Sequence, residues 1–348
     1  METIYVLEPG SYLRKDGETL KVVRDGQVTD QVPMEGLNRL ILIGNISLSS
    51  GVLDYLIQQR VETVFLTSTG RYRARLALDE HKHVALRRAQ YLGLSQPSFA
   101  LKTAKIIVEG KVGNMYRFLL RRASQYQKSE LKLATARLKA LSASVNAALN
   151  LDAVRGVEGA VSRIYFQAFP CLIQNPDFSF SGRNRRPPLD PVNALLSSVY
   201  TMLTNEVLSA AKTVGLDPYL GALHEVSYGR PSLACDLVEE YRTYLGDRLV
   251  LSLINRQAMS PDDFVYRAPA LPEYTAEEEM KEKRPVEMKP QICRTFIAAY
   301  EQMMKSTIHY PPLGKKVNYR WLFLQQAQVF KRYLEEPAAE YQPFKWDS

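Results

Sequence analysis

The strongest constraint on the fold is a change in hydrophobic period near residue 80. Before it, short runs rich in β-branched residues alternate with turn signals such as Asp16-Gly17 and Asp25-Gly26, which are typical of hairpins. After it, apolar residues recur every three or four positions, as in amphipathic helices. We therefore expect an α+β chain, with a small β-rich, sandwich-like domain over residues 1–78 and a larger all-α domain over 79–348.

Three local signals refine the first domain. The unbroken apolar run Leu40–Ile43 indicates a strand that is buried on both faces. Ser49 or Ser50 is a suitable N-cap for one helix that would pack on the sheet. Pro33 argues against a central strand at that position, because proline lacks the N–H that a ladder needs.

The second domain is expected to consist of successive helices. Asp190-Pro191 and Asp217-Pro218 each combine an N-cap residue with a proline suited to the first turn, and Arg230-Pro231 opens a further helix. Residues 255–290 contain five prolines and are expected to be irregular. The expected helices cover about 80–94, 98–125, 129–149, 151–167, 191–212, 231–254, 291–305 and 317–335.

Composition and missing motifs exclude several classes of protein. No apolar run approaches the ~20 residues that span a bilayer, and the first residues lack the pattern of a secretory signal. Three cysteines lie far apart without a CxxC pair, which fits a reducing cytoplasm and disfavours a disulfide scaffold. The sequence has no phosphate-binding GxxxxGK[ST], no GxGxxG, no HExxH and no GxSxG.

The basic residues are unevenly distributed. The chain carries a net charge of +8, but residues 71–140 alone hold sixteen basic and four acidic side chains, a net of +12. Aromatic residues are interleaved with them, and a second cluster is formed by Arg183, Arg185 and Arg186. This mixture suits phosphate contacts and base stacking, although a solvated helical face is the alternative explanation.

A few polar residues interrupt apolar helical patterns. Glu158 borders an apolar stripe between Gly156 and Gly159. Such glycines weaken a helix by up to ~1 kcal/mol each, a cost that is easier to understand if something must approach the backbone closely. The alternative for Glu158 is an ordinary residue on the edge of a surface helix.

Two further segments supply candidate metal ligands. His224 is one of four histidines, and Asp236 and Glu239 lie three residues apart on one helix face. Carboxylates with one imidazole suit octahedral Mg²⁺ or Mn²⁺. Taken singly, His224 is more often a satisfied core or surface histidine, and the two acids are more often an exposed acidic turn.

The segments GVEGAVSRIYF, DPVNALLSSVYTML and HEVSYGRPSLACDLVEEYR occur in that order. Together they resemble the signature blocks of the CRISPR-associated spacer-acquisition integrase family, and TSTGRYRARL and LRRAQY agree with its N-terminal blocks. The resemblance covers nearly the whole chain. It implies a Glu–His–Asp metal site with a further acid one turn later, which by motif falls on Glu158, His224, Asp236 and Glu239. It also implies a DNA-facing Arg230 and a structural Asn193.

The resemblance implies a cytoplasmic, metal-dependent DNA endonuclease and integrase that uses Mg²⁺ or Mn²⁺. The 3′-hydroxyl of a protospacer with single-stranded ends would attack a phosphodiester in CRISPR repeat DNA. The implied partners are a second copy of the chain, the small dimeric second core acquisition protein and a prespacer-trimming nuclease, without a membrane. Two alternatives remain open: a stand-alone nuclease acting on branched DNA in repair, and a basic DNA-binding scaffold without chemistry.

Overall fold

In the computed structural model the chain divides into two compact units. The first comprises Met1–Glu80 with Glu287–Phe296, and the second comprises His81–Val286 with Ile297–Ser348. The residues that the structure describes are 2–67, 72–76, 83–184, 187–267, 285–336 and 338–346. None of the helices in these residues combines the length and the hydropathy that a membrane span requires.

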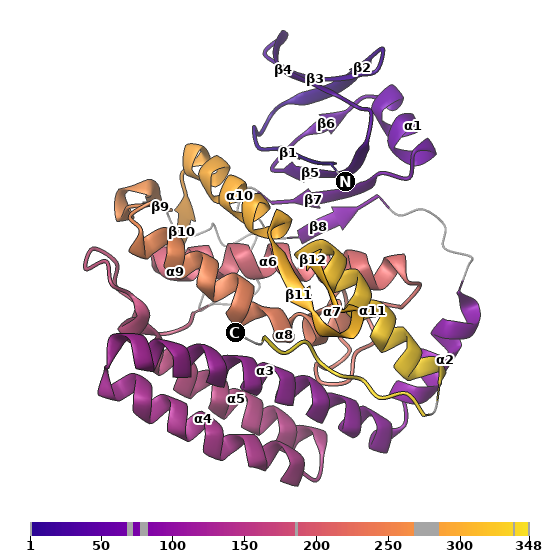
Figure 1. Ribbon diagram of the computed structural model, residues 1–348. Coiled ribbons are helices and arrows are strands. Elements are labelled where there is room, and N and C mark those ends of the chain that lie inside the picture. Colours follow the sequence, from indigo (N-terminus) through magenta and orange to yellow (C-terminus); the bar gives the residue numbers. More distant parts are fainter. Residues whose placement is uncertain are drawn as a thin grey trace. The chain divides into compact units, whose positions relative to one another are not determined.

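The first unit contains two four-stranded sheets (Figure 1). One has the order β1-β5-β7-β8, with parallel pairing except between β7 and β8. Leu40 and Leu42 of its inner strand β5 are fully buried, which confirms the expected buried strand. The strands of this sheet are β1 (Glu2–Val6), β5 (Leu37–Ile43), β7 (Glu62–Leu66) and β8 (Tyr72–Arg75).

The second sheet has the order β4-β3-β2-β6. Positive φ angles at Gly17, and at Asp25 with Gly26, form the two expected hairpin turns. Pro33 ends β4, an edge strand, as its missing N–H requires. The strands are β2 (Tyr12–Asp16), β3 (Thr19–Arg24), β4 (Gln27–Pro33) and β6 (Ser47–Leu48).

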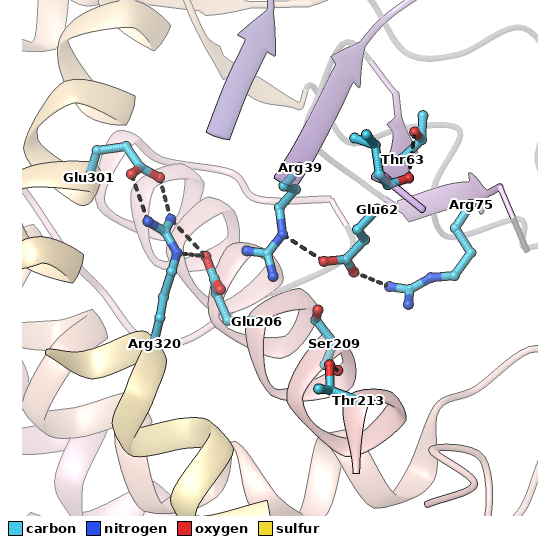
Figure 2. Close-up of polar contacts among 10 residues, drawn as sticks. Arg39, Glu62, Thr63, Arg75, Glu206, Ser209, Thr213, Glu301 and Arg320 are labelled. Carbon is cyan, nitrogen blue, oxygen red and sulfur yellow. Dashed lines mark hydrogen bonds and ion pairs between the residues drawn. The ribbon is translucent and has the colours of Figure 1, made fainter. Parts of the chain in front are cut away.

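One apolar core joins the two sheets and a helix. It includes Leu13 and Leu20 from the second sheet, Leu40 from the first, and Leu56 from α1 (Ser50–Gln58). Ser49 caps that helix by accepting a hydrogen bond from the N–H of Val52. On the first sheet, the carboxylate of Glu62 pairs with two arginines, Arg39 at 2.7 Å and Arg75 at 3.5 Å (Figure 2).

The second unit is mostly helical, and the expected α+β class is confirmed. Asp190 caps α6 by accepting a hydrogen bond from the N–H of Asn193. Its helices are α2 (Val84–Leu94), α3 (Pro97–Tyr126), α4 (Ser129–Ala147), α5 (Leu151–Ala168), α6 (Pro191–Thr213), α7 (Ser232–Leu237), α8 (Glu239–Tyr241), α9 (Arg248–Asn255) and α11 (Tyr319–Glu335). Helix α10 (Pro290–Lys305) belongs to this unit from Ile297 onward.

Three features of this part of the chain differ from the sequence-based expectations. Asp217-Pro218 starts no helix, because the Asp217 side chain accepts from the N–H of Tyr219 in a local turn. The expected helix 231–254 is divided by a π-helical turn at Arg242–Asp247. Two short two-stranded sheets also occur where no strand was expected. β9 (Phe264–Tyr266) and β10 (Val286–Met288) lie in the stretch expected to be irregular, and β11 (Thr307–Tyr310) and β12 (Lys315–Asn318) lie between the last two helices.

Helices α3, α4 and α5 lie side by side, and the end of the chain runs along α3 (Figure 1). We call residues 338–346 the C-terminal strap. The buried Asn114 donates to the carbonyl of Phe344 at 2.9 Å and accepts from the N–H of Trp346 at 3.0 Å. A Cβ added to Gly110 would lie 2.6 Å from the Pro343 Cβ, so only glycine allows the strap to come this close.

A partly buried ion-pair triad connects three other helical segments of this unit. Arg320 of α11 donates to Glu206 of α6 at 3.0 Å and pairs with Glu301 of α10 (Figure 2). Because both carboxylates contact the same guanidinium, no member of the triad is left as an uncompensated buried charge. The triad therefore fixes the three helices against one another.

Candidate active site

The loop between α6 and α7 is wrapped around the carboxylate of Asp236, which is fully buried. One carboxylate oxygen accepts from the N–H groups of Ala222 at 2.6 Å and Leu223 at 3.0 Å. The other accepts from the N–H of His224 at 3.0 Å. A methyl group at Gly221 would overlap this carboxylate, so the glycine is required for the close approach of the loop. Asp236 thereby fixes the backbone that leads into His224.

Asp236 also fixes the imidazole of His224. Its Oδ1 lies 2.6 Å from His224 Nδ1. An ionised carboxylate only accepts hydrogen bonds, so Nδ1 carries the proton and Nε2 keeps its lone pair. The His224 side chain is 23% exposed, which leaves the ring open to a ligand. A carboxylate that orients a histidine in this way is common behind metal-ligating imidazoles.

Two carboxylates from different helices meet at one lysine. Lys111 of α3 is 3% exposed, and its ammonium pairs with Glu158 of α5 and lies 2.9 Å from Glu239 Oε2 at the start of α8. Ser162, one turn after Glu158, donates to the same carboxylate at 3.0 Å. The fold thus brings together Glu158 and Glu239, which are far apart in the sequence.

Glu239 is held in its ionised form. Burial alone would raise its pKa, but the positive charges of Arg242 and Lys111 lower the pKa to about 2. Arg242 Nη1 lies 2.6 Å from Glu239 Oε1, one helical turn away.

The donor set fits Mg²⁺ or Mn²⁺, since it offers two carboxylates and one imidazole nitrogen. In the part of the chain that the structure describes, no three His, Cys, Asp or Glu side chains are grouped closely enough to hold a metal ion. Instead the Lys111 ammonium occupies the space between Glu158 and Glu239. Metal binding by Glu158, His224, Asp236 and Glu239 therefore stays a prediction.

A polar network supports the helix that carries Glu239. The Arg242 guanidinium lies 5.1 Å from the ring centroid of Tyr200. The Tyr200 hydroxyl donates to the buried carboxylate of Asp247, which also accepts from Tyr165 at 2.7 Å. Arg242 and Asp247 are the two ends of the π-helical turn, a distortion that is frequent at functional sites.

We expect the Asp247→Asn variant to change how stability depends on pH. Burial raises the pKa of Asp247 to about 6, although Tyr200, Tyr165, Arg183 and Arg242 all act to lower it. A folded-state pKa above the unfolded value means that stability is lost as the pH rises from about 4 to about 6. The wild-type protein should lose about 2 kcal/mol relative to Asp247→Asn between about pH 4 and 7, as measured by urea unfolding. Parallel pH profiles would contradict the assignment.

The expected DNA-contacting arginines occupy different environments. Arg183 donates to Asn193 at 2.7 Å and to Ser197 at 3.1 Å, and it lies 5.4 Å from the Tyr200 ring centroid. Its guanidinium is thus tied to α6. Arg230 is exposed. Arg185 and Arg186 lie outside the described residues, and the DNA contacts of all four arginines stay predictions.

Three important residues of the site were not singled out from the sequence. They are Lys111, Arg242 and Asp247. Lys111 was counted within the basic stretch, yet its neighbours Val108, Gly110 and Val112 are buried with it. A lone lysine within a buried helical segment is the signal that could have identified it.

The comparisons with known proteins identify the family. The family described as CRISPR associated protein Cas1 matches residues 4–302. A CRISPR-associated endonuclease Cas1 of Chlorobaculum tepidum is 36% identical, covering 99% of this chain and 98% of the relative. One from Thermus thermophilus is also 36% identical over 98% of this chain and 96% of the relative. A Cas4 exonuclease/Cas1 endonuclease fusion of Geobacter sulfurreducens is 31% identical, covering 98% of this chain and 60% of the fusion.

Solved structures share the fold. A Cas1 protein from Thermotoga maritima matches with a TM-score of 0.79 at 23% identity over all of both chains. A casposase bound to integration product matches with a TM-score of 0.81 at 21% identity, covering 100% of this chain and 95% of that chain. The endonuclease relatives, 36% identical over nearly the whole chain, make the protein a DNA endonuclease of CRISPR systems. The chain belongs to the CRISPR-associated protein Cas1 family, which removes the scaffold without chemistry from the alternatives.

Proposed function

We propose that this endonuclease integrates protospacer DNA into a CRISPR array. The 3′-hydroxyl of the incoming strand attacks a phosphodiester of the repeat. A new P–O bond forms, the old P–O bond to the repeat strand breaks, and that strand leaves as a 3′-hydroxyl after taking up a proton. The observation that carries the proposal is the meeting of Glu158 and Glu239, from two different helices, at the buried ammonium of Lys111, together with the His224 imidazole that Asp236 orients through Nδ1.

Glu158, Glu239 and His224 Nε2 would hold Mg²⁺ or Mn²⁺. When bound, such an ion lowers the pKa of the attacking hydroxyl and neutralises charge that develops on the phosphate. Asp236 acts through His224, because both of its oxygens are already occupied by four hydrogen bonds. This assignment makes Asp236 a positioning residue and Glu239 a ligand, whereas the resemblance placed both residues among the metal ligands.

Lys111 and Arg242 complete the electrostatics of the proposed site. Arg242 keeps Glu239 ionised and fixes one of its oxygens. Lys111 supplies a positive charge at the place where a phosphate oxygen would accumulate negative charge. Lys111 is nearly inaccessible in the free chain and Arg242 is 17% exposed, so we expect both to act on the reacting phosphate and the carboxylates rather than along the length of the duplex.

Replacing Gly156 or Gly159 by alanine is expected to stabilise the protein while weakening integration. An added Cβ at either position meets nothing within 4 Å, so each substitution should stabilise α5 by up to ~1 kcal/mol. Both glycines flank Glu158, and we expect the DNA backbone to approach the bare helix there. Thermal unfolding and strand transfer measured on the same variants would test this. Unchanged strand transfer in both variants would show that nothing approaches the helix closely.

The proposed partners follow from the relatives. The Cas4/Cas1 fusion joins an exonuclease to this kind of chain, which supports a trimming nuclease as a partner. A structure described as a Cas6-RT-Cas1–Cas2 complex contains a chain of the same fold, with a TM-score of 0.83 at 24% identity, and this chain covers 36% of it. This supports assembly with the small dimeric second core acquisition protein. We further propose a homodimer and a DNA substrate with single-stranded 3′ ends.

A direct comparison of two reactions separates integration from repair of branched DNA. The purified protein, with its small partner, is given labelled prespacers and a repeat-containing plasmid in Mg²⁺ or Mn²⁺. Integration predicts that strand transfer into the repeat is faster than hydrolysis of any branched substrate, and that chelation stops both reactions. Branched-DNA hydrolysis without any strand transfer would favour the repair nuclease instead.

A further inference from the structure

A fully exposed aromatic side chain, Tyr228, follows His224 by four residues in the chain. Tyr228 has a relative exposure of 108%, the largest among the exposed large apolar side chains of the described residues. Most surface tyrosines cover part of the ring with neighbouring side chains, whereas both faces of this ring are open. Tyr228 belongs to an exposed six-residue segment, 225–230, which we call the tyrosine loop.

The tyrosine loop presents Tyr228 in a defined way. The N–H of Arg230 donates to the carbonyl of Ser227 at 3.1 Å, which closes a turn with Tyr228 and Gly229 at its centre. Gly229 has φ +72°, as the third position of a type II turn requires. The ring therefore projects from the tip of a hydrogen-bonded turn.

Both ends of the loop are tied to the helices of the proposed site. At its start, Arg155 of α5 pairs with Glu225 at 3.0 Å and donates to the carbonyl of Leu223 at 2.8 Å. Arg155 lies one turn before Glu158. At its end, Ser232 of α7 donates to the carbonyl of Glu225 at 2.9 Å. These contacts hold the tyrosine loop in a fixed position relative to Glu158 and His224.

We infer that Tyr228 stacks on an unpaired base near the 3′ end of the attacking DNA strand, an inference that rests on the proposed function. The Cα atoms of His224 and Tyr228 are at most about 14 Å apart, which is the length of about four stacked nucleotides, so the ring can reach unpaired bases near the reacting 3′ end. An open aromatic face binds any base, which suits a protein that takes up DNA of varied sequence. The exposed Arg230, two residues further on, offers a positive charge for the adjoining phosphate.

The test is a double-mutant cycle between the ring and the DNA. Prespacers with four-nucleotide 3′ overhangs carry an abasic site at each overhang position in turn, and strand transfer is measured with wild type, Tyr228→Ala and Tyr228→Trp. Tyr228→Ala should slow transfer by about tenfold or more, while Tyr228→Trp should retain it. At the stacked position, the abasic site should remove the difference between wild type and Tyr228→Ala.

Fluorescence gives a readout that needs no chemistry. 2-Aminopurine placed at the stacked position should be quenched on binding wild type and remain bright with Tyr228→Ala. The matched control is Tyr266→Ala, which removes a 52% exposed tyrosine from β9 and should leave both readouts unchanged. Because the Tyr228 ring contacts nothing, Tyr228→Ala should also unfold at the wild-type temperature.

Several outcomes would overturn the inference. Equal strand-transfer rates for wild type and Tyr228→Ala would contradict it. A rate loss in Tyr228→Ala that is the same on intact and abasic overhangs would also contradict it, because the ring would then contact something other than a base. If the wild-type protein performs no strand transfer on any prespacer, the proposed function fails. The quenching measurement still decides whether Tyr228 stacks on DNA.

Discussion

Replacing Glu239 by glutamine is expected to abolish strand transfer and divalent-ion binding, whereas replacing Asp236 by asparagine should only weaken both. In the proposed site Glu239 contributes an ionised oxygen ligand, and an amide cannot supply its charge. Asp236 orients His224 without touching the ion, and loss of such a support lowers metal affinity or activity by about 10- to 100-fold. Isothermal titration with Mn²⁺ and strand-transfer rates would measure the two effects separately.

The control for this comparison is the folded state of each variant. Asp236 accepts three backbone hydrogen bonds and one from His224, so Asp236→Asn should also lower the unfolding temperature. Excess Mn²⁺ should restore part of its activity, because the ligands remain. The reverse pattern would refute the assignment: an Asp236→Asn protein that binds no Mn²⁺ and a Glu239→Gln protein that still binds it would make Asp236 the ligand.

Much of the fold follows from local sequence, because local chemistry determines hairpin turns and helix starts. Asp25-Gly26 adopts the positive φ angles that its turn needs, and Asp190 caps α6 through its own side chain. Asp217-Pro218 carries the same signal as Asp190-Pro191 but forms only a turn. Gln90 of α2 exchanges hydrogen bonds with the backbone of Asp217, so a distant helix determines this conformation.

The candidate site was only partly predictable for the same reason. Spacing placed Asp236 and Glu239 on one helix face, but it could not tell which carboxylate is wrapped by the loop and which meets α3. That distinction depends on Lys111, which lies more than a hundred residues away from Glu239 and was indistinguishable in sequence from its basic neighbours. Local sequence patterns also do not predict the hydrogen bond between Asn114 and Trp346, which are far apart in the chain.

The C-terminal strap is attached to the same helices that carry Lys111 and Glu239. Along it, Tyr341, Phe344 and Trp346 are buried, while Gln342 and Lys345 are exposed. The Phe344 ring is stacked 5.6 Å from Tyr241, and its N–H donates to Glu240 at 2.8 Å. Glu240 directly follows Glu239, so these contacts of the strap hold the backbone of α8 in place.

We therefore expect Phe344→Ala to destabilise the protein and to impair catalysis together. Removing a buried phenyl ring costs about 3–5 kcal/mol, which corresponds to a fall in unfolding temperature of about 10 °C in a unit of this size. Strand transfer should fall more than DNA binding, because the loosened α8 misplaces Glu239 while most basic residues stay in place.

Lys345→Ala is the matched control and should leave stability within about 0.5 kcal/mol of wild type. Gly110→Ala, which pushes on Pro343 from the α3 side, should reproduce the catalytic defect. Full strand transfer by a folded Phe344→Ala protein would show that the strap stabilises the helices without positioning the site.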